Sequence, residues 1–175
     1  QTALAVAPAD TDEFMVSDGG VLKRIDYSLI KGGASEQFFV YLSADQTPIT
    51  SDTYTKVLFN TEEIDTGSNF ASYKYVAPSD GKYFFHTQVY VNSSAVTELK
   101  RAKLAIYKNG ASYSNSAGDF EANYIKKFNS TLTAIMDLSA TDYIEVYAVG
   151  VQASSTTLSF SGGTTKYTSF MGWKM

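Results

Sequence analysis

The side chains that could take part in acid–base or nucleophilic chemistry are few. The sequence has one histidine, His86, and no cysteine, so disulfides, thiolate metal sites and cysteine nucleophiles are excluded. His86 stands inside the apolar run "YFFHTQVYV", with no second histidine and no group of carboxylates beside it. A metal site or a general base depends on such neighbours. We therefore expect His86 to lie in a core or an interface, and we expect no metal ion and no cofactor.

Three carboxylates come close together in the sequence: Asp137, Asp142 and Glu145. A glycosidase needs two carboxyl groups roughly 5 to 9.5 Å apart, in a cleft that raises the pKa of one of them, and the surrounding residues do not indicate such a cleft. The segment Ser159–Thr165, "SFSGGTT", contains two glycines but lacks the lysine and the following helix of a phosphate-binding loop. The sequence therefore favours a protein that is not an enzyme.

Aromatic and small polar residues are mixed in the segment "ASYSNSAGDFEANY", which we expect to be a loop. Aromatic rings beside amides and carboxylates are typical of surfaces that contact carbohydrate or protein, because the ring stacks and the polar groups set the orientation. The alternative is that the rings fold the segment onto its own domain, and the sequence leaves both interpretations open. The candidate receptor contacts are Tyr113, Asn115, Asp119, Phe120 and Tyr124.

The composition indicates a folded chain that does not bind nucleic acid. Of the 175 residues, 44% are hydrophobic, 14% aromatic and 18% charged. The aromatic share is high and the charged share is low, which argues for a folded chain and against disorder. The formal net charge is −4, whereas phosphate binding needs several cations gathered on one face. No apolar run approaches the ~18 residues of a membrane span, so we expect no membrane insertion. Because the sequence begins at Gln1 rather than Met, we interpret it as the end of a longer polypeptide.

Alternating hydrophobicity is the main structural signal. In an expected strand from Gly81 to Val91, successive side chains point to opposite faces. One face carries Tyr83, Phe85, Thr87 and Val89, and the other carries Phe84, His86, Gln88 and Tyr90. Because both faces carry rings, we expect both to be covered, one by the core of the domain and one by another surface.

Further short strands separated by turn residues predict an all-β sandwich or barrel. A tight turn is indicated at Asn109-Gly110. The other expected strands are Phe38–Ser43, Thr55–Asn60, Ala102–Lys108, Ser130–Ser139, Asp142–Gly150 and Lys166–Met175. The expected loops are Thr66–Ser72, Ala111–Asn123 and Gln152–Thr165.

The first part of the chain predicts a separate β-hairpin. Apolar runs at Phe14–Val16 and Val21–Ile25 flank a turn at Asp18–Gly20. Two strands cannot bury a core by themselves. Glycine and serine near Lys31–Gln37 mark the boundary, so we divide the chain into a hairpin module at residues 1–36 and a head domain at residues 37–175.

The head domain resembles the globular head family of complement component 1q, a trimeric jelly roll related to tumour necrosis factor. The matching residues are Phe59 and Asn60 at a strand end, Gly81, Tyr83 and Phe85 in a Gly-x-Tyr-x-Phe motif, Asn109 and Gly110 in a Lys-Asn-Gly turn, and Ser169, Phe170, Gly172 and Trp173 in the closing strand. One position departs from the family: Thr141 stands where the family usually has glycine before Asp142, so we expect that turn to differ.

The hairpin, "TDEFMVSDGGVLKRIDYSLI", is similar to a segment of tail-fibre and other virion fibre proteins of tailed bacteriophages, where it often precedes a C-terminal adhesive head. Together the two resemblances imply a homotrimer that forms the non-enzymatic head of a tail fibre. They also imply a location in the virion. Its partners would be upstream fibre or other virion proteins and a glycan or protein receptor on the host cell.

In a homotrimer, three hairpins can share one small core, and neighbouring subunits can bury the outer aromatic face of the Gly81–Val91 strand. The predicted trimer interface is therefore Phe84, His86 and Tyr90. Two alternatives remain open. One is a purely architectural virion protein, which terminates a fibre or decorates a capsid. The other is a secreted or bacterial-surface binding module of the same fold.

Overall fold

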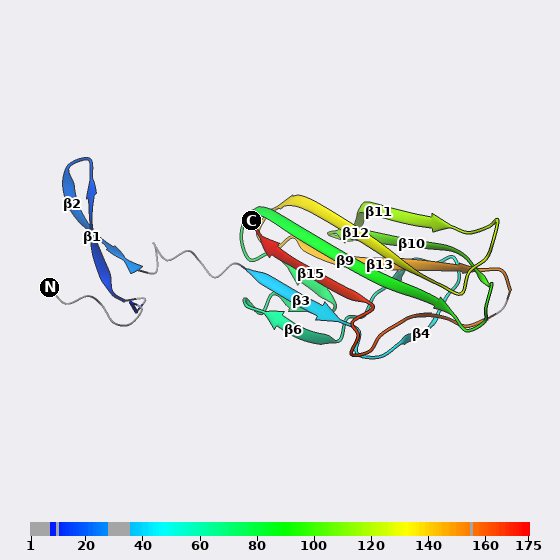
Figure 1. The fold of residues 1–175 in the computed structure, drawn as a ribbon. Coiled ribbons are helices and arrows are strands. Elements are labelled where there is room, and N and C mark those ends of the chain that lie inside the picture. The colour runs from blue at the N-terminus through cyan, green and yellow to red at the C-terminus, as the bar shows by residue number, and fades with distance from the viewer. Residues whose placement is uncertain (1–7, 10, 28–35, 155) are drawn as a thin grey trace. The chain divides into compact units, whose positions relative to one another are not determined.

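The computed structural model describes residues 8–9, 11–27, 36–154 and 156–175. Contacts within the chain divide it into two units, Gln1–Ser35 and Glu36–Met175 (Figure 1). The second unit begins one residue before the boundary drawn from the sequence.

The first unit contains the expected β-hairpin. Strands β1 (Glu13–Asp18) and β2 (Val21–Asp26) pair antiparallel, with Phe14 opposite Ile25. Gly19 and Gly20 have φ values of 60° and 83°, as a tight hairpin turn requires. The hairpin leaves apolar side chains in solvent, since Met15, Val21 and Leu22 are 66%, 60% and 68% exposed.

The second unit is a sandwich of two sheets in which all described strand pairs are antiparallel. We name each sheet after a central strand. The β10 sheet contains β5 (Thr55–Lys56), β7 (Phe70–Ala71), β8 (Lys74–Val76), β10 (Leu99–Lys108), β11 (Ala111–Asp119) and β13 (Tyr143–Gln152). The β9 sheet contains β3 (Gln37–Tyr41), β4 (Gln46–Ile49), β6 (Thr61–Asp65), β9 (Gly81–Ser93), β12 (Lys127–Leu138), β14 (Leu158–Phe160) and β15 (Ser169–Lys174).

Strand β9 is central to its sheet. It pairs with β12 along one side and with β15 and β14 along the other (Figure 1). The β9 sheet ends at β6, which pairs with β3, and the β10 sheet ends at β7, which pairs with β8. At the opposite edges, β11 and β12 are joined across the sandwich by side chains: the Tyr113 hydroxyl donates to the Ile135 carbonyl at 3.4 Å, and the Ser116 hydroxyl donates to the Thr131 carbonyl at 3.3 Å.

The core lies between the two sheets and is rich in aromatic rings. Along β9 the predicted alternation is confirmed: Tyr83, Phe85, Thr87, Val89 and Val91 are buried. The ring of Phe38 stacks on Tyr75 with centroids 4.6 Å apart and meets the edge of Phe170 at 4.8 Å. Such pairs stabilise a core beyond the burial of their apolar area.

The prediction from the sequence was wrong for several segments that we expected to be irregular. Ala111–Asp119, expected to be part of a loop, is strand β11, and the expected loops Thr66–Ser72 and Gln152–Thr165 contain β7 and β14. Conversely, the expected strand Thr55–Asn60 ends at Lys56. The physical reason is clearest for β11. Asn109 and Gly110 adopt left-handed φ values of 52° and 79°, and this turn folds the following segment back along β10 although its side chains are small and polar.

Candidate interaction surfaces

The outer face of the β9 sheet carries a group of large side chains. Because alternate residues of each strand point away from the core, β3, β9, β12 and β15 all contribute to this surface. We call it the aromatic face and define it as Phe39, Tyr41, Phe84, His86, Tyr90, Ile135, Met171 and Trp173.

Contacts within the aromatic face fix its rings. Phe84 stacks on Trp173 with centroids 4.2 Å apart, and Tyr90 stacks on Tyr167 at 5.2 Å. Nδ1 of His86 lies 3.0 Å from the hydroxyl of Thr133. Even so, Trp173 remains 39% exposed and Ile135 54% exposed. These side chains are ordered against one another while part of their apolar surface stays in water.

Two lysines lie beside rings of this face. The Lys166 ammonium lies 5.5 Å from the ring centroids of both Phe39 and Tyr41 and pairs with Glu63. The Lys127 ammonium lies 5.5 Å from the Tyr90 ring. Aromatic side chains are enriched at protein interfaces, and this face carries several.

The three residues predicted for the trimer interface, Phe84, His86 and Tyr90, all lie in β9, point to the aromatic face and are half-buried. The sequence reasoning missed their neighbours on β3, β12 and β15. Alternation in the closing segment "SFMGWKM" is the signal that could have identified Met171 and Trp173, since Phe170 and Gly172, which alternate with them, are buried.

The five candidate receptor contacts do not form one loop. Tyr113, Asn115 and Asp119 are exposed along strand β11, and Asp119 pairs with Arg101 at 3.1 Å. Phe120 packs on Phe128 with centroids 4.8 Å apart, so for this ring folding onto its own domain is correct. Tyr124 is half-buried, with the Lys100 ammonium 5.6 Å from its ring.

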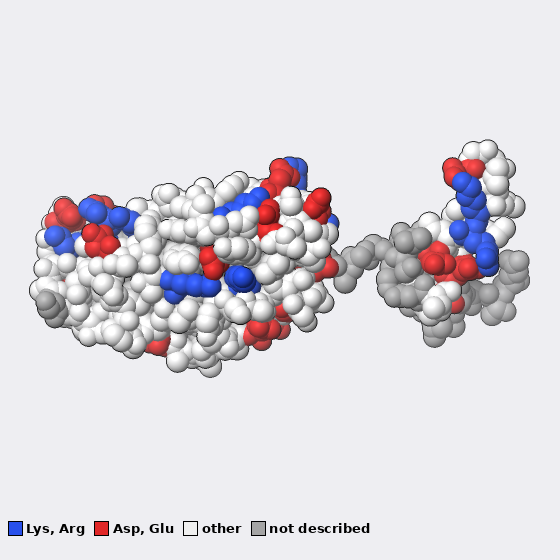
Figure 2. Space-filling view, turned by 180° about the vertical axis from the view of Figure 1, so that it is seen from behind, with Lys and Arg blue, Asp and Glu red and all other residues white. Residues whose placement is uncertain are grey.

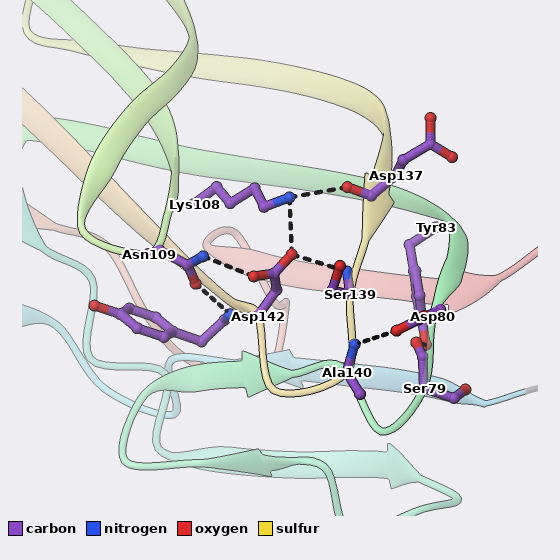
Figure 3. A network of polar contacts seen from close by, with 10 residues as sticks. Ser79, Asp80, Tyr83, Lys108, Asn109, Asp137, Ser139, Ala140 and Asp142 are labelled. Carbon is purple, nitrogen blue, oxygen red and sulfur yellow. Dashed lines mark hydrogen bonds and ion pairs between the residues drawn. The ribbon is translucent and has the colours of Figure 1, made fainter.

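The three neighbouring carboxylates have separate structural partners. Asp137 pairs with Lys82 at 2.8 Å on the surface, and the buried Glu145 pairs with Lys56 at 2.7 Å. Asp142 lies in the turn between β12 and β13 (Figure 3).

The Asp142 carboxylate pairs with the Lys108 ammonium at 2.8 Å and accepts from the Asn109 amide at 2.7 Å and the Ser139 N–H at 2.9 Å (Figure 3). These donors, with Lys108 contributing most, lower the pKa of Asp142 to about 2. The preceding residue, Thr141, has a φ of 75°, a conformation that β-branched residues rarely adopt.

Charge and metal-ligand patterns add no further site. Among the described residues, no group of three or more histidine, cysteine, aspartate or glutamate side chains could hold a metal ion. On the face shown in Figure 2, basic and acidic side chains occur in small mixed groups with uncharged surface between them. In the described part of the chain, no helix has the length and apolar character needed to cross a membrane.

No family model and no curated protein sequence matches this chain. Solved structures do match its fold. The globular domain of zebrafish complement 1qA protein superimposes with a TM-score of 0.56 at 14% identity, covering 80% of this chain and 97% of the zebrafish chain. The Eiger tumour necrosis factor of S. frugiperda superimposes with a TM-score of 0.58 at 11% identity, covering 81% of this chain and 92% of the Eiger chain. The chain therefore has the all-β jelly-roll fold of the complement 1q and tumour necrosis factor type.

Proposed function

We propose that this protein is a non-enzymatic homotrimeric binding head that assembles through the aromatic face. The observation that carries the proposal is the group of stacked, partly exposed rings on the outer side of the β9 sheet, centred on Phe84 and Trp173. Partly exposed apolar side chains gathered on one face of a domain are typical of an interaction site. The fold supports this assignment, because the resemblance to complement component 1q implies a trimer.

The hairpin supports the same assembly independently. Its exposed Met15, Val21 and Leu22 have no core to enter, and an isolated two-stranded hairpin is at best marginally stable. Copies related by a rotation axis would bring identical hairpins together. Each hairpin would then bury its apolar side chains against the other two.

We further propose that the trimer is the head of a virion fibre that attaches to a host cell surface. This proposal is supported by the similarity of residues 11–30 to phage fibre segments and by the exposed side chains of Tyr113, Asn115 and Asp119 along β11. In this proposal, upstream fibre residues anchor the head to the particle and the receptor is a glycan or a protein. Several weak sites on one trimer would bind together with an avidity far above that of one site.

Adsorption of the purified intact chain to bacterial cells tests the attachment role. The labelled trimer is expected to bind at least one strain of a diverse panel, and the triple variant Tyr113→Ala, Asn115→Ala and Asp119→Ala is expected to bind less while keeping the trimer mass. Val96→Ala provides the control, because Val96 is 66% exposed and lies outside both surfaces.

Full adsorption of the triple variant would exclude the β11 surface as the contact. An intact trimer that binds no cell and no glycan would favour the architectural alternative.

A further inference from the structure

A second surface lies at the edge of the sandwich where β6 and β7 end their sheets. A pocket of about 400 Å³ opens there to solvent, which is within the range of about 300–1,000 Å³ for small-ligand sites. We call it the edge pocket. It is lined by Phe59, Asn60, Glu62, Phe70, Ala71, Ser72 and Tyr73.

Two polar side chains that line the edge pocket, Asn60 and Glu62, each have a group that can form a hydrogen bond with a ligand. The Asn60 Oδ1 accepts from the Ser43 N–H at 2.9 Å and from the Ser43 hydroxyl at 3.2 Å, which leaves its NH₂ group as a donor. Glu62 is exposed, and no hydrogen bond or ion pair joins its carboxylate to another described residue. The pocket therefore offers one amide donor and one carboxylate acceptor.

The aromatic wall of the pocket is Tyr73, whose side chain is 40% exposed. Ser72 and Tyr73 form the two-residue turn between β7 and β8, with left-handed φ values of 52° and 61°. The Lys56 ammonium donates to the Ser72 carbonyl at 3.1 Å and lies 5.9 Å from the Tyr73 ring. Lys56 is itself paired with the buried Glu145 at 2.7 Å. This ion pair fixes the position of the ammonium group that bonds to the turn.

Two phenylalanines form the apolar floor of the pocket. Phe59 and Phe70 are only 2% and 5% exposed and belong to the core. Such a floor excludes water from one side of a ligand, while the polar groups at the rim set its orientation.

We infer that the edge pocket binds a neutral saccharide. One face of a pyranose ring consists of C–H groups that can pack on an aromatic ring such as Tyr73, and its hydroxyls can both donate to Glu62 and accept from Asn60. An anionic ligand is disfavoured by the Glu62 carboxylate, and Lys56, a cation beside the turn, is already paired with Glu145. The inference adds a saccharide site to the proposed attachment role and rests on that role. This site lies at the edge of the sandwich opposite β11, and each protomer contains all of its residues.

Saturation-transfer NMR on the intact chain, with a panel of neutral methyl glycosides as probes, tests the inference. At least one glycoside is expected to receive saturation, and titration is expected to shift the signals of Glu62 and Tyr73. Tyr73→Asn removes the ring and suits a left-handed φ; it is expected to weaken binding about tenfold or more. Asn60→Asp keeps the oxygen that Ser43 needs and removes the donor, so it too is expected to weaken binding.

Tyr54→Asn is the matched control, because Tyr54 is also a tyrosine with 40% exposure and lies outside the edge pocket, the aromatic face and β11. Binding that survives Tyr73→Asn and Asn60→Asp unchanged, or that is lost only in Tyr54→Asn, would overturn the inference. So would a failure of every glycoside to bind, including the case in which methylammonium, tested as a cationic probe, binds at Glu62 instead.

The two proposals can fail separately. Cell adsorption that persists in Tyr73→Asn, without any saccharide binding, would reject the edge pocket and leave the attachment role. Saccharide binding at Tyr73 by a chain that adsorbs to no cell would reject attachment and leave the pocket.

Discussion

At the scale of single residues, Thr141 holds a backbone conformation that is unfavourable for a residue with a Cβ atom. Its φ of 75° is left-handed, which costs about 1–2 kcal/mol for a residue with a Cβ atom, whereas glycine adds an entropic cost of roughly 0.5–1 kcal/mol. The N–H of residue 141, which donates to the Ala77 carbonyl at 2.8 Å, is retained in either residue. We therefore expect Thr141→Gly to raise the free energy of unfolding by about 0.5–1 kcal/mol, measured by urea denaturation.

The control is Thr164→Gly, since Thr164 is also an exposed residue in a turn but has no positive φ. It should lose stability by the entropic cost of glycine. Equal losses for the two variants would show that the strain at Thr141 is absent.

The adjacent Asp142 predicts a pH dependence. Its pKa is lowered to about 2 by Lys108, Asn109 and Ser139, so folding favours the ionised carboxylate. The resulting stabilisation is fully present above the ordinary carboxyl pKa near 3.8 and is lost as the pH falls towards 2. Asp142→Asn should therefore be less stable than the parent at pH 7, with a difference that shrinks between pH 4 and pH 2.

Thermal unfolding across this pH range, with Asp137→Asn as the exposed control, checks that prediction. A difference between Asp142→Asn and the parent that stays constant with pH would contradict it.

A charge introduced at Phe84 tests whether the aromatic face forms the interface between subunits. The Phe84 ring stacks on Trp173 at 4.2 Å, and a buried, unpaired charge costs about 3–5 kcal/mol at each copy of a symmetric contact. We expect Phe84→Asp to be monomeric at micromolar concentration in sedimentation velocity experiments. Val96→Asp, on an exposed turn residue, should sediment like the parent. A Phe84→Asp variant that kept the parent's mass would remove this face from the interface.

Some of these residues could be predicted from the sequence and others could not. Strict alternation along β9 identified the buried Tyr83 and Phe85 and the outward-facing Phe84 and Tyr90, because successive side chains of a strand point to opposite faces. The edge pocket could not be predicted, because Asn60 and Tyr73 meet only when the edges of two sheets are brought together. Neither residue has a local spacing that indicates a site.

At the scale of elements, strand β11 shows the limit of composition as a guide. Its residues, "ASYSNSAGD", have the character of a loop, yet the Asn109-Gly110 turn pairs them with β10. The long strands β9, β10, β12 and β13 were predicted well, because their core positions are apolar. The short strands β4, β7 and β14 were missed, because pairing with distant neighbours rather than local pattern defines them.

The hairpin is the element whose role is most open to test. If its apolar side chains are buried only between copies, then deleting residues 1–35 should leave the head folded, lower its thermal midpoint and raise the concentration at which the trimer dissociates. Replacing the same residues with a glycine-serine linker controls for chain length. An unchanged midpoint would make the hairpin a passive connector, and failure of the head to fold would contradict the division into two units.

At the scale of the whole molecule, the two edges of the sandwich differ. One edge is closed by hydrogen bonds from Tyr113 and Ser116 to β12, and the other holds the edge pocket. The aromatic face lies on the β9 sheet, away from the β10 sheet. Self-association is thus assigned to the β9 sheet, saccharide binding to the open edge and a further receptor contact to β11, so a trimer would present each binding site three times.

The mass of the intact chain in solution tests this account most directly. Sedimentation equilibrium at micromolar concentration should give three times the chain mass of 19.1 kDa, with no dependence on concentration across the range studied. A single species with the mass of one chain would contradict the central claim, because the aromatic face would then remain in solvent.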